Sequence, residues 1–242
     1  MPNTIAITLH ASGAESASGA SSTPIDLGDR TLVEFTLDVT ALAATTVVTV
    51  IVETSRTGTE WVFAGRFDAL SKPSTRALVI PDALRFIRAR WAIAGSSPSA
   101  TFALTAVAHQ LYALPADIAR YGLPAAALEL VSPEQLARAC LAASGEAEGY
   151  LSSAYKLPLT AWDIGTRSHV AKMAAYEAMR HRGFDPDSGK DASLEVGRGE
   201  AITWLNRIAN GKLRPVGIVD STPEAAENEV YVASERGRSW RV

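Results

Sequence analysis

The chain has 242 residues, of which 47% are hydrophobic and 20% charged, and its formal net charge is −3. A chain of this length can bury one large core or two modest ones. The charge is shared between the halves, roughly −1 for residues 1–114 and −2 for the rest, so neither half has the basic excess typical of a domain that binds duplex nucleic acid.

The N-terminal sequence MPNTIAITLHASG has no charged segment followed by an apolar one, and no apolar run approaches the ~20 residues of a membrane span. We therefore expect a soluble, unexported protein with no membrane partner. Its one cysteine, Cys140, cannot form an internal disulfide, which fits synthesis in a reducing cytoplasm. No motif places a catalytic partner beside it, so we interpret Cys140 as a small core residue.

Composition changes along the chain and predicts an α+β protein of two domains. The first half is rich in Thr, Val and Ser, and the second in Ala, Leu, Glu and Arg, which favour strands and helices respectively. We expect a β-sandwich over residues 1–113, a small α-helical bundle over 114–215 and an extended C-terminal arm over 216–242.

Short runs with period-two alternation dominate the first half. Residues 3–10 predict a first strand, whereas 11–24, ASGAESASGASSTP, indicate a flexible loop or arm. The remaining strands are expected at residues 31–38, 47–54, 61–67, 77–80, 84–94 and 101–109. Short strands separated by turn clusters, with no helical period between them, are typical of an antiparallel sandwich.

This predicted sandwich carries no obvious chemistry. Trp61, Phe63 and Phe67 alternate with smaller residues and are interpreted as core packing rather than a sugar platform. Three arginines share one predicted strand with Phe86, namely Arg85, Arg88 and Arg90. Because Arg88 and Arg90 fall on the same face as Phe86, a solvated basic stripe is favoured over a phosphate or partner site.

Helical periodicity begins at Leu114. Residues 115–122 predict a short helix that is closed by Gly122 in a left-handed cap conformation. Ser132, Pro133 and Gln135 form a capping-box signature that opens a long helix. The apolar face of that helix is predicted to contain Leu136, Ala139, Cys140, Ala143, Ala147, Tyr150, Leu151 and Ala154.

Two further helices are expected after the Leu157-Pro158-Leu159 break. Thr160 is the predicted cap of a helix that runs to about Arg182, and Ser193 opens a third that ends at Gly211. Three helices joined by short connections make a small helical domain. The residues after Leu213 show no sustained period beyond a short strand predicted at 229–233.

The sequence contains no complete motif for catalysis, for a cofactor or for a metal. Gly197-Arg198-Gly199 lacks the third glycine of a dinucleotide turn, and Lys190 stands where a calcium loop built on Asp185, Asp187 and Asp191 requires glycine. The histidines have no zinc-site spacing; they are His10, His109, His169 and His181. We expect no enzyme, no cofactor and no metal site.

Three segments of the helical half resemble the Mu-type bacteriophage head-completion proteins. They are Ile118–Gly122 (IARYG), Tyr150–Leu159 (YLSSAYKLPL) and Trp204–Leu213 (WLNRIANGKL), and they occur in the family's order across residues 115–215. The resemblance implies a head-to-tail connector, or adaptor, in the neck of a tailed phage virion. Such proteins form a ring, commonly of twelve subunits, between the portal protein and tail-side neck or tail-completion proteins, and DNA only passes through the lumen.

Related adaptors engage the portal through a C-terminal arm, and this chain offers a matching segment at residues 230–242. Trp and Arg are the residue types that dominate protein–protein hot spots, and an extended segment can bind by strand addition or by inserting an aromatic ring into a pocket. The expected portal-contact residues are Tyr231, Arg236, Arg238, Trp240 and Arg241.

The chain departs from that family by its N-terminal β-domain, since family members consist of little more than the helical domain. We expect this domain to lie outside the ring, against capsid, neighbouring subunits or collar proteins. Two alternatives stay open. One is a binding module whose sandwich recognises carbohydrate or a host surface, and the other is a small hydrolase or nuclease whose site is assembled across the domains.

Overall fold

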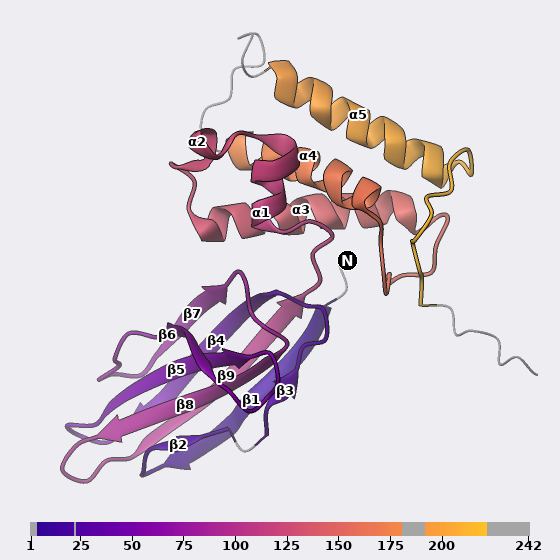
Figure 1. Ribbon diagram of the computed structural model, residues 1–242. Coiled ribbons are helices and arrows are strands. Elements are labelled where there is room, and N and C mark those ends of the chain that lie inside the picture. Colours follow the sequence, from indigo (N-terminus) through magenta and orange to yellow (C-terminus); the bar gives the residue numbers. More distant parts are fainter. Residues whose placement is uncertain (1–3, 22, 181–191, 222–242) are drawn as a thin grey trace, which may run out of the picture.

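A computed structural model describes residues 4–21, 23–180 and 192–221. The chain first builds two stacked antiparallel sheets and then a group of helices that lies over one end of them (Figure 1). The α+β architecture and the antiparallel sandwich predicted from the sequence are confirmed. No helix in the described ranges combines the length and the apolar character needed to cross a membrane.

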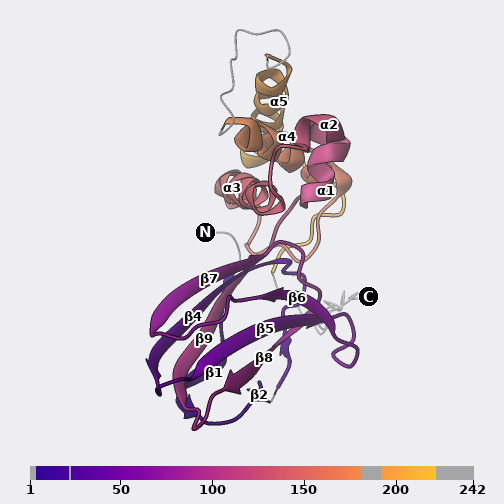
Figure 2. The same ribbon diagram turned by 90° about the vertical axis from the view of Figure 1, so that its left-hand side faces the viewer.

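The sandwich is built from strands that pair only in antiparallel fashion. The strands are β1 (Thr4–Glu15), β2 (Gly19–Ala20), β3 (Ile25–Asp26), β4 (Leu32–Leu42), β5 (Val47–Ser55), β6 (Val62–Arg66), β7 (Ser74–Ile80), β8 (Phe86–Ala94) and β9 (Ala100–His109). One sheet has the order β1-β9-β4-β7 and the other β2-β8-β5-β6, with β3 also paired to β8. Figure 2 shows the two sheets from the side.

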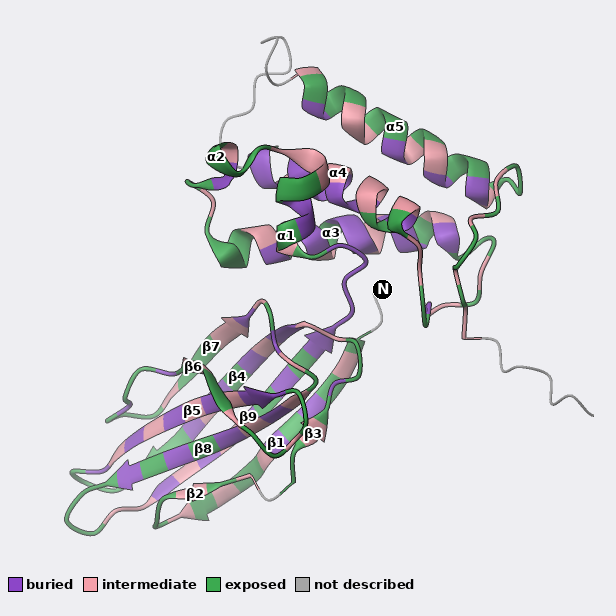
Figure 3. Ribbon diagram, viewed as in Figure 1, coloured by how far each residue is buried: buried purple, intermediate pink, exposed green. Residues whose placement is uncertain are grey.

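Strict alternation along the central strands creates the sandwich core. In β5, Val48, Val50 and Val52 are buried while their neighbours are partly exposed, because successive side chains of a strand point to opposite faces. The same alternation runs along β4, β8 and β9 (Figure 3). Burial of these apolar faces is the main force that holds the two sheets together.

The prediction of a flexible loop over residues 11–24 is wrong for residues 11–15 and 19–20, which are strands. Residues 11–15 continue β1 along β9, with Gly13 opposite Phe102 and Glu15 opposite Ala100, and Gly19–Ala20 form β2. An edge strand is held by backbone hydrogen bonds and needs few apolar side chains. The composition of residues 11–24 therefore did not indicate these strands. Gly19 also lies so close to Trp91 that a Cβ atom would be 2.8 Å from the indole ring, which explains a small residue there.

The prediction that the aromatic row packs in the core is wrong for Phe63. Phe67 is buried, but Phe63 is 65% exposed. A register shift in the pairing of β5 with β6, between Val52 and Glu53, brings Phe63 opposite Glu53 and Gly65 opposite Val52. This bulge reverses the alternation, so Phe63 lies on the outer face and Phe67 on the inner one.

The helical half contains α1 (Pro115–Asp117), a π-helical turn η1 (Ile118–Gly122), α2 (Ala125–Leu128), α3 (Pro133–Leu151), α4 (Ile164–Arg180) and α5 (Ala192–Ala209). The capping box of α3 is confirmed, since Gln135 N donates to Ser132 Oγ at 3.2 Å and Ser132 N donates to Gln135 Oε1 at 2.9 Å. The predicted stop after α5 is confirmed by the left-handed φ of 69° at Gly211.

Gly122 is not the left-handed cap that was expected, because its φ is not among the positive values found. A Cβ atom at this position would lie 2.5 Å from the Cβ of Ala175 and 3.1 Å from the carbonyl oxygen of Ala171. The glycine therefore allows η1 to approach α4 closely. Cys140, in contrast, is fully buried in the helical core, as predicted.

The cap of α4 is Asp163 rather than Thr160. Asp163 Oδ1 accepts from the backbone N–H of Thr166 at 2.8 Å and from its hydroxyl at 2.7 Å. Thr160 instead donates its backbone N–H to Val219 O at 2.8 Å. Residues 216–221, which were assigned to an extended arm, thus start by packing back onto the connection between α3 and α4.

Candidate site at the junction of the two domains

The segment that joins the sandwich to the helices is buried, although it is a connection. Gln110, Leu111, Tyr112 and Ala113 are each at most 5% exposed, and the three apolar ones belong to the helical core. Leu32, at the start of β4, belongs to that core as well. The two halves are therefore packed together and not merely tethered.

Polar contacts fix the buried segment against α3 and the loop before α4. Tyr112 Oη donates to Glu148 Oε1 at 3.0 Å, Tyr112 N donates to Ser144 Oγ at 3.0 Å, and Trp162 Nε1 donates to Tyr112 O at 2.9 Å. Burial, together with the charge of Glu148, raises the pKa of Tyr112 above its usual value. The phenol therefore stays protonated and keeps donating.

One ion pair crosses the same junction at the surface, and its carboxylate also lies near a histidine of the sandwich. Arg138 of α3 lies 3.1 Å from Glu34 of β4, and Glu34 lies 3.4 Å from His109 at the end of β9. Since Arg138 and Glu34 are partly solvent-exposed, the pair contributes little stability, but it helps to define the angle between the domains.

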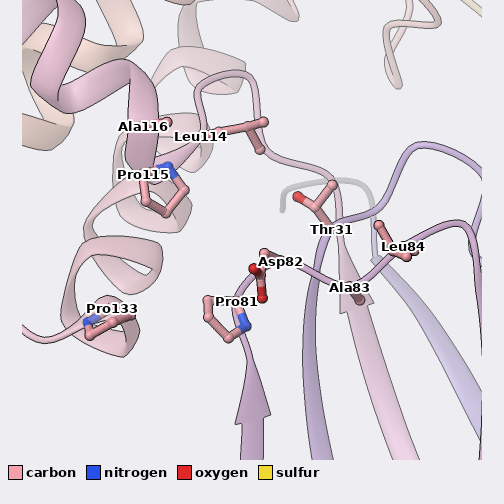
Figure 4. A pocket seen from close by; sticks show the side chains of 9 residues that line it. All are labelled: Thr31, Pro81, Asp82, Ala83, Leu84, Leu114, Pro115, Ala116 and Pro133. Carbon is pink, nitrogen blue, oxygen red and sulfur yellow. The ribbon is translucent and has the colours of Figure 1, made fainter. Parts of the chain in front are cut away.

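A cleft opens beside this junction and has two continuous halves. The apolar half has a volume of about 400 Å³ and is lined by Thr31, Pro81, Asp82, Ala83, Leu84, Leu114, Pro115, Ala116 and Pro133. Figure 4 shows Pro115 and Pro133 on the helical side and Pro81 and Asp82 on the turn after β7. Rigid proline rings on both walls give a preformed, largely apolar surface.

The second half of the cleft is basic. It has a volume of about 390 Å³ and shares Thr31, Ala83, Leu84 and Leu114 with the apolar half. Its other lining residues are Gly28, Asp29, Arg30, Arg85, Leu111, Tyr112, Trp162 and Arg167. Three guanidinium groups and one carboxylate line this half, and the Arg85 guanidinium is already paired with Asp26, which is not part of the lining, so the remaining excess of positive charge is small.

Arg85 and Arg167 face solvent but differ in how far their charge is already paired. Arg85 donates from Nε and Nη2 to both carboxylate oxygens of Asp26 and lowers the pKa of that carboxyl, whereas Arg167, among the described residues, pairs with Asp117 alone, at 3.9 Å. Arg30 donates to Leu27 O at 3.1 Å, which orients its side chain. Chemically, the cleft suits an extended peptide that carries carboxylates next to apolar side chains.

Of the residues that the sequence suggested as possible sites, Arg85 lines the basic half of the cleft, and the other described ones do not line it. The expected portal-contact set (Tyr231, Arg236, Arg238, Trp240, Arg241) and the Asp185–Asp191 loop lie outside the described residues. Arg88 and Arg90 do share the outer face of β8, but both contact Glu53, and Arg88 lies over the Trp61 ring. Gly197 and Gly199 are inside α5.

Titratable side chains of the described ranges form no grouping of three or more His, Cys, Asp or Glu residues suited to a metal ion. Burial raises the pKa of the Cys140 thiol to about 12, so the thiolate that nucleophilic catalysis requires is strongly disfavoured there.

Sequence reasoning missed the interdomain cleft. The one feature of the sequence that could have indicated the cleft is the set of prolines at the ends of helices and strands near the domain boundary at Leu114, namely Pro81, Pro115 and Pro133.

Comparison with protein families gives one match. Residues 124–234 match the family described as Bacteriophage Mu, Gp36. This range contains two of the three motifs that carried the resemblance and begins just after the first, Ile118–Gly122. The resemblance to Mu-type phage structural proteins is confirmed, and it supports a structural role in a bacteriophage virion. The search of curated proteins gave no significant match.

Solved structures that are similar to this chain share only part of it. The PBSX exported protein XepA is 19% identical, with a TM-score of 0.35 over 44% of this chain and 37% of its own. The structure of the infectious bursal disease virus Gx strain is 11% identical, with a TM-score of 0.34 over 45% of this chain and 32% of its own. The Bacillus endospore appendage structure is 10% identical, with a TM-score of 0.33 over 46% of this chain and 90% of its own. The chain thus spans about a third of the length of the first two.

Proposed function

We propose that this protein is a head-to-tail connector of a tailed phage, which forms a ring between the portal and the tail-side neck proteins. The family match over residues 124–234 carries the proposal, because it covers the main helices and most of the segment that follows them. In this proposal residues 1–113 form a peripheral β-domain, 114–215 the connector domain and 216–242 the portal-binding arm.

The packed junction between the domains supports this role. A ring repeats one heterologous contact, which requires two different complementary faces on a subunit whose shape is maintained. The buried Leu111–Ala113 segment and the shared core residue Leu32 provide that rigidity. A net charge of only −3 also suits a lumen through which DNA must pass without being retained. We propose no catalytic activity.

The arm contacts the portal through Tyr231, Arg236, Arg238, Trp240 and Arg241 in this proposal. Residues 216–221 are its anchored base, since Ser221 N donates to Lys156 O at 3.1 Å and Val219 N to Ala161 O at 2.9 Å.

A pull-down tests the connector proposal. Purified protein is mixed with DNA-filled heads that contain the portal but lack this protein, and the full chain is compared with a chain that ends after Pro223. We expect the full chain to bind and the shortened chain to lose binding. A Trp240→Ala, Arg241→Ala variant of the full chain serves as a milder test. Failure of the full chain to bind would contradict the proposal.

The second candidate is a binding module for carbohydrate or a host surface, and one observation favours it. Phe63 is largely exposed on the outer face of the sandwich, where the neighbouring Trp61 ring carries Arg88 at 4.3 Å from its centroid. Aromatic rings next to guanidinium groups are common in recognition surfaces. Glycan binding by the free protein that is lost in Phe63→Ala would support this candidate.

A further inference from the structure

We propose that residues 224–232 of the arm bind in the interdomain cleft of their own chain, with their carboxylates in the basic half and their valines in the apolar half. The proposal goes beyond the connector role and concerns the free subunit, so it holds or fails independently of portal binding.

The anchored base of the arm starts the argument. Thr160 N donates to Val219 O at 2.8 Å, and Val219 N donates to Ala161 O at 2.9 Å. Ser221 N donates to Lys156 O at 3.1 Å. The next residue after Ala161 is Trp162, which lines the basic half of the cleft. The base of the arm therefore lies against residues 156–161, the connection that continues directly into Trp162 in the lining of the basic half.

The length of the chain that follows sets how far the arm can reach. An extended chain covers ~3.3–3.6 Å per residue, so Glu224 reaches about 10 Å beyond Ser221 and Val232 reaches about 35–40 Å beyond it at most. In this proposal the arm enters the basic half first and continues into the apolar half, with the two domains in the arrangement described above.

The order of residue types in the arm matches the order of surfaces in the cleft. Glu224, Glu227 and Glu229 come first, opposite the half lined by the three arginines. Val230 and Val232 follow, opposite the half lined by prolines and Leu114. In an extended segment the two valines point to the same side and Tyr231 to the other, which leaves Tyr231 available to a partner.

Arg167 is the arginine of the cleft that has capacity for a further partner. It is about half exposed, and the carboxylate nearest to it among the described residues, that of Asp117, is 3.9 Å away, whereas Arg85 is already held by Asp26. Asp29 and Asp82 also line the cleft and oppose an acidic peptide. Individual surface ion pairs are weak, and docking therefore relies on the high local concentration of a covalently attached arm.

Disulfide trapping in the full-length chain tests the proposal. Leu114, which lines both halves and is 38% exposed, is replaced by Cys together with Val230→Cys. The matched control pairs Val230→Cys with Ile164→Cys, because Ile164 is more exposed, at 67%, and lies nearer to the base of the arm in sequence. Native Cys140 is fully buried and does not compete.

We expect the Leu114–Val230 pair to form an intramolecular disulfide at least tenfold faster than the control pair under mild oxidation. Arg167→Glu should abolish most of this rate advantage. Adding Glu227→Arg to the Arg167→Glu variant should restore the advantage, and such a rescue would not be possible if Arg167→Glu had acted by unfolding the protein. Equal rates for the two pairs would overturn the proposal. Cross-links that form only between chains, seen when the single-cysteine variants are mixed, would overturn it in favour of a neighbouring subunit's arm.

Discussion

Gly122 shows how a single residue can be required by its neighbours rather than by its own backbone. A methyl group at this position has no room between η1 and α4, since Ala175 and the Ala171 carbonyl already occupy the space. Gly149 in α3 provides the opposite case, because no atom lies within 4 Å of a Cβ atom placed there.

Replacing Gly122 by Ala should therefore destabilise the protein by about 1–3 kcal/mol through overpacking. Gly149→Ala should stabilise it by about 0.5–1 kcal/mol, because glycine is a poor helix former. Urea unfolding monitored by circular dichroism measures both. A stabilising effect of Gly122→Ala would show that η1 moves away from α4 easily.

His169 is the residue from which we expect a dependence of stability on pH. Burial lowers its pKa below 6.5, and nearby Lys172 acts in the same direction; its ring stacks on Trp204 with 4.4 Å between centroids. The unfolded chain, with an ordinary pKa, takes up a proton first as the pH falls through 6.5. Stability should therefore be complete above that pH and decrease below it.

The measurement is the free energy of unfolding at pH 8 and at pH 5.5 for the natural protein and for His169→Gln. The variant should lose less stability between the two pH values, even though it is less stable at pH 8 without the stacked ring. An unchanged pH dependence would exclude His169 as its source.

At the scale of elements, the start of α3 is determined locally. Ser132 and Gln135 satisfy each other's backbone N–H groups, and this pattern is complete within four residues. Ser132→Ala should cost about 0.5–2 kcal/mol, whereas Ser132→Asp should retain most of the stability, since Asp caps equally well. Thermal unfolding of the two variants compares them directly, and equal losses would mean that the cap contributes nothing specific.

At the scale of the whole molecule, Leu32 couples the two domains. It lies in a strand of the sandwich but is buried in the helical core, so Leu32→Ala should cost about 2–5 kcal/mol and reduce the hydrogen-exchange protection of α3 and α4. Val50→Ala, within the sandwich core alone, is the control, and its effect should be largest in β5 and β8. Helices that keep full protection in Leu32→Ala would contradict this coupling.

The sequence by itself determined features that depend on neighbouring residues. Alternation along β5 and β8, the capping box at Ser132 and the glycine stop at Gly211 need only local spacing, and the motifs at Tyr150–Leu159 and Trp204–Leu213 indicated the phage family. Tertiary structure decided the rest. The bulge that turns Phe63 outward, the close approach that requires Gly122 and the edge pairing of residues 11–15 depend on segments far away in the chain. The interdomain cleft likewise exists only because Leu32 and the Leu111–Ala113 segment pack the sandwich against the helices, and no local pattern contains that contact.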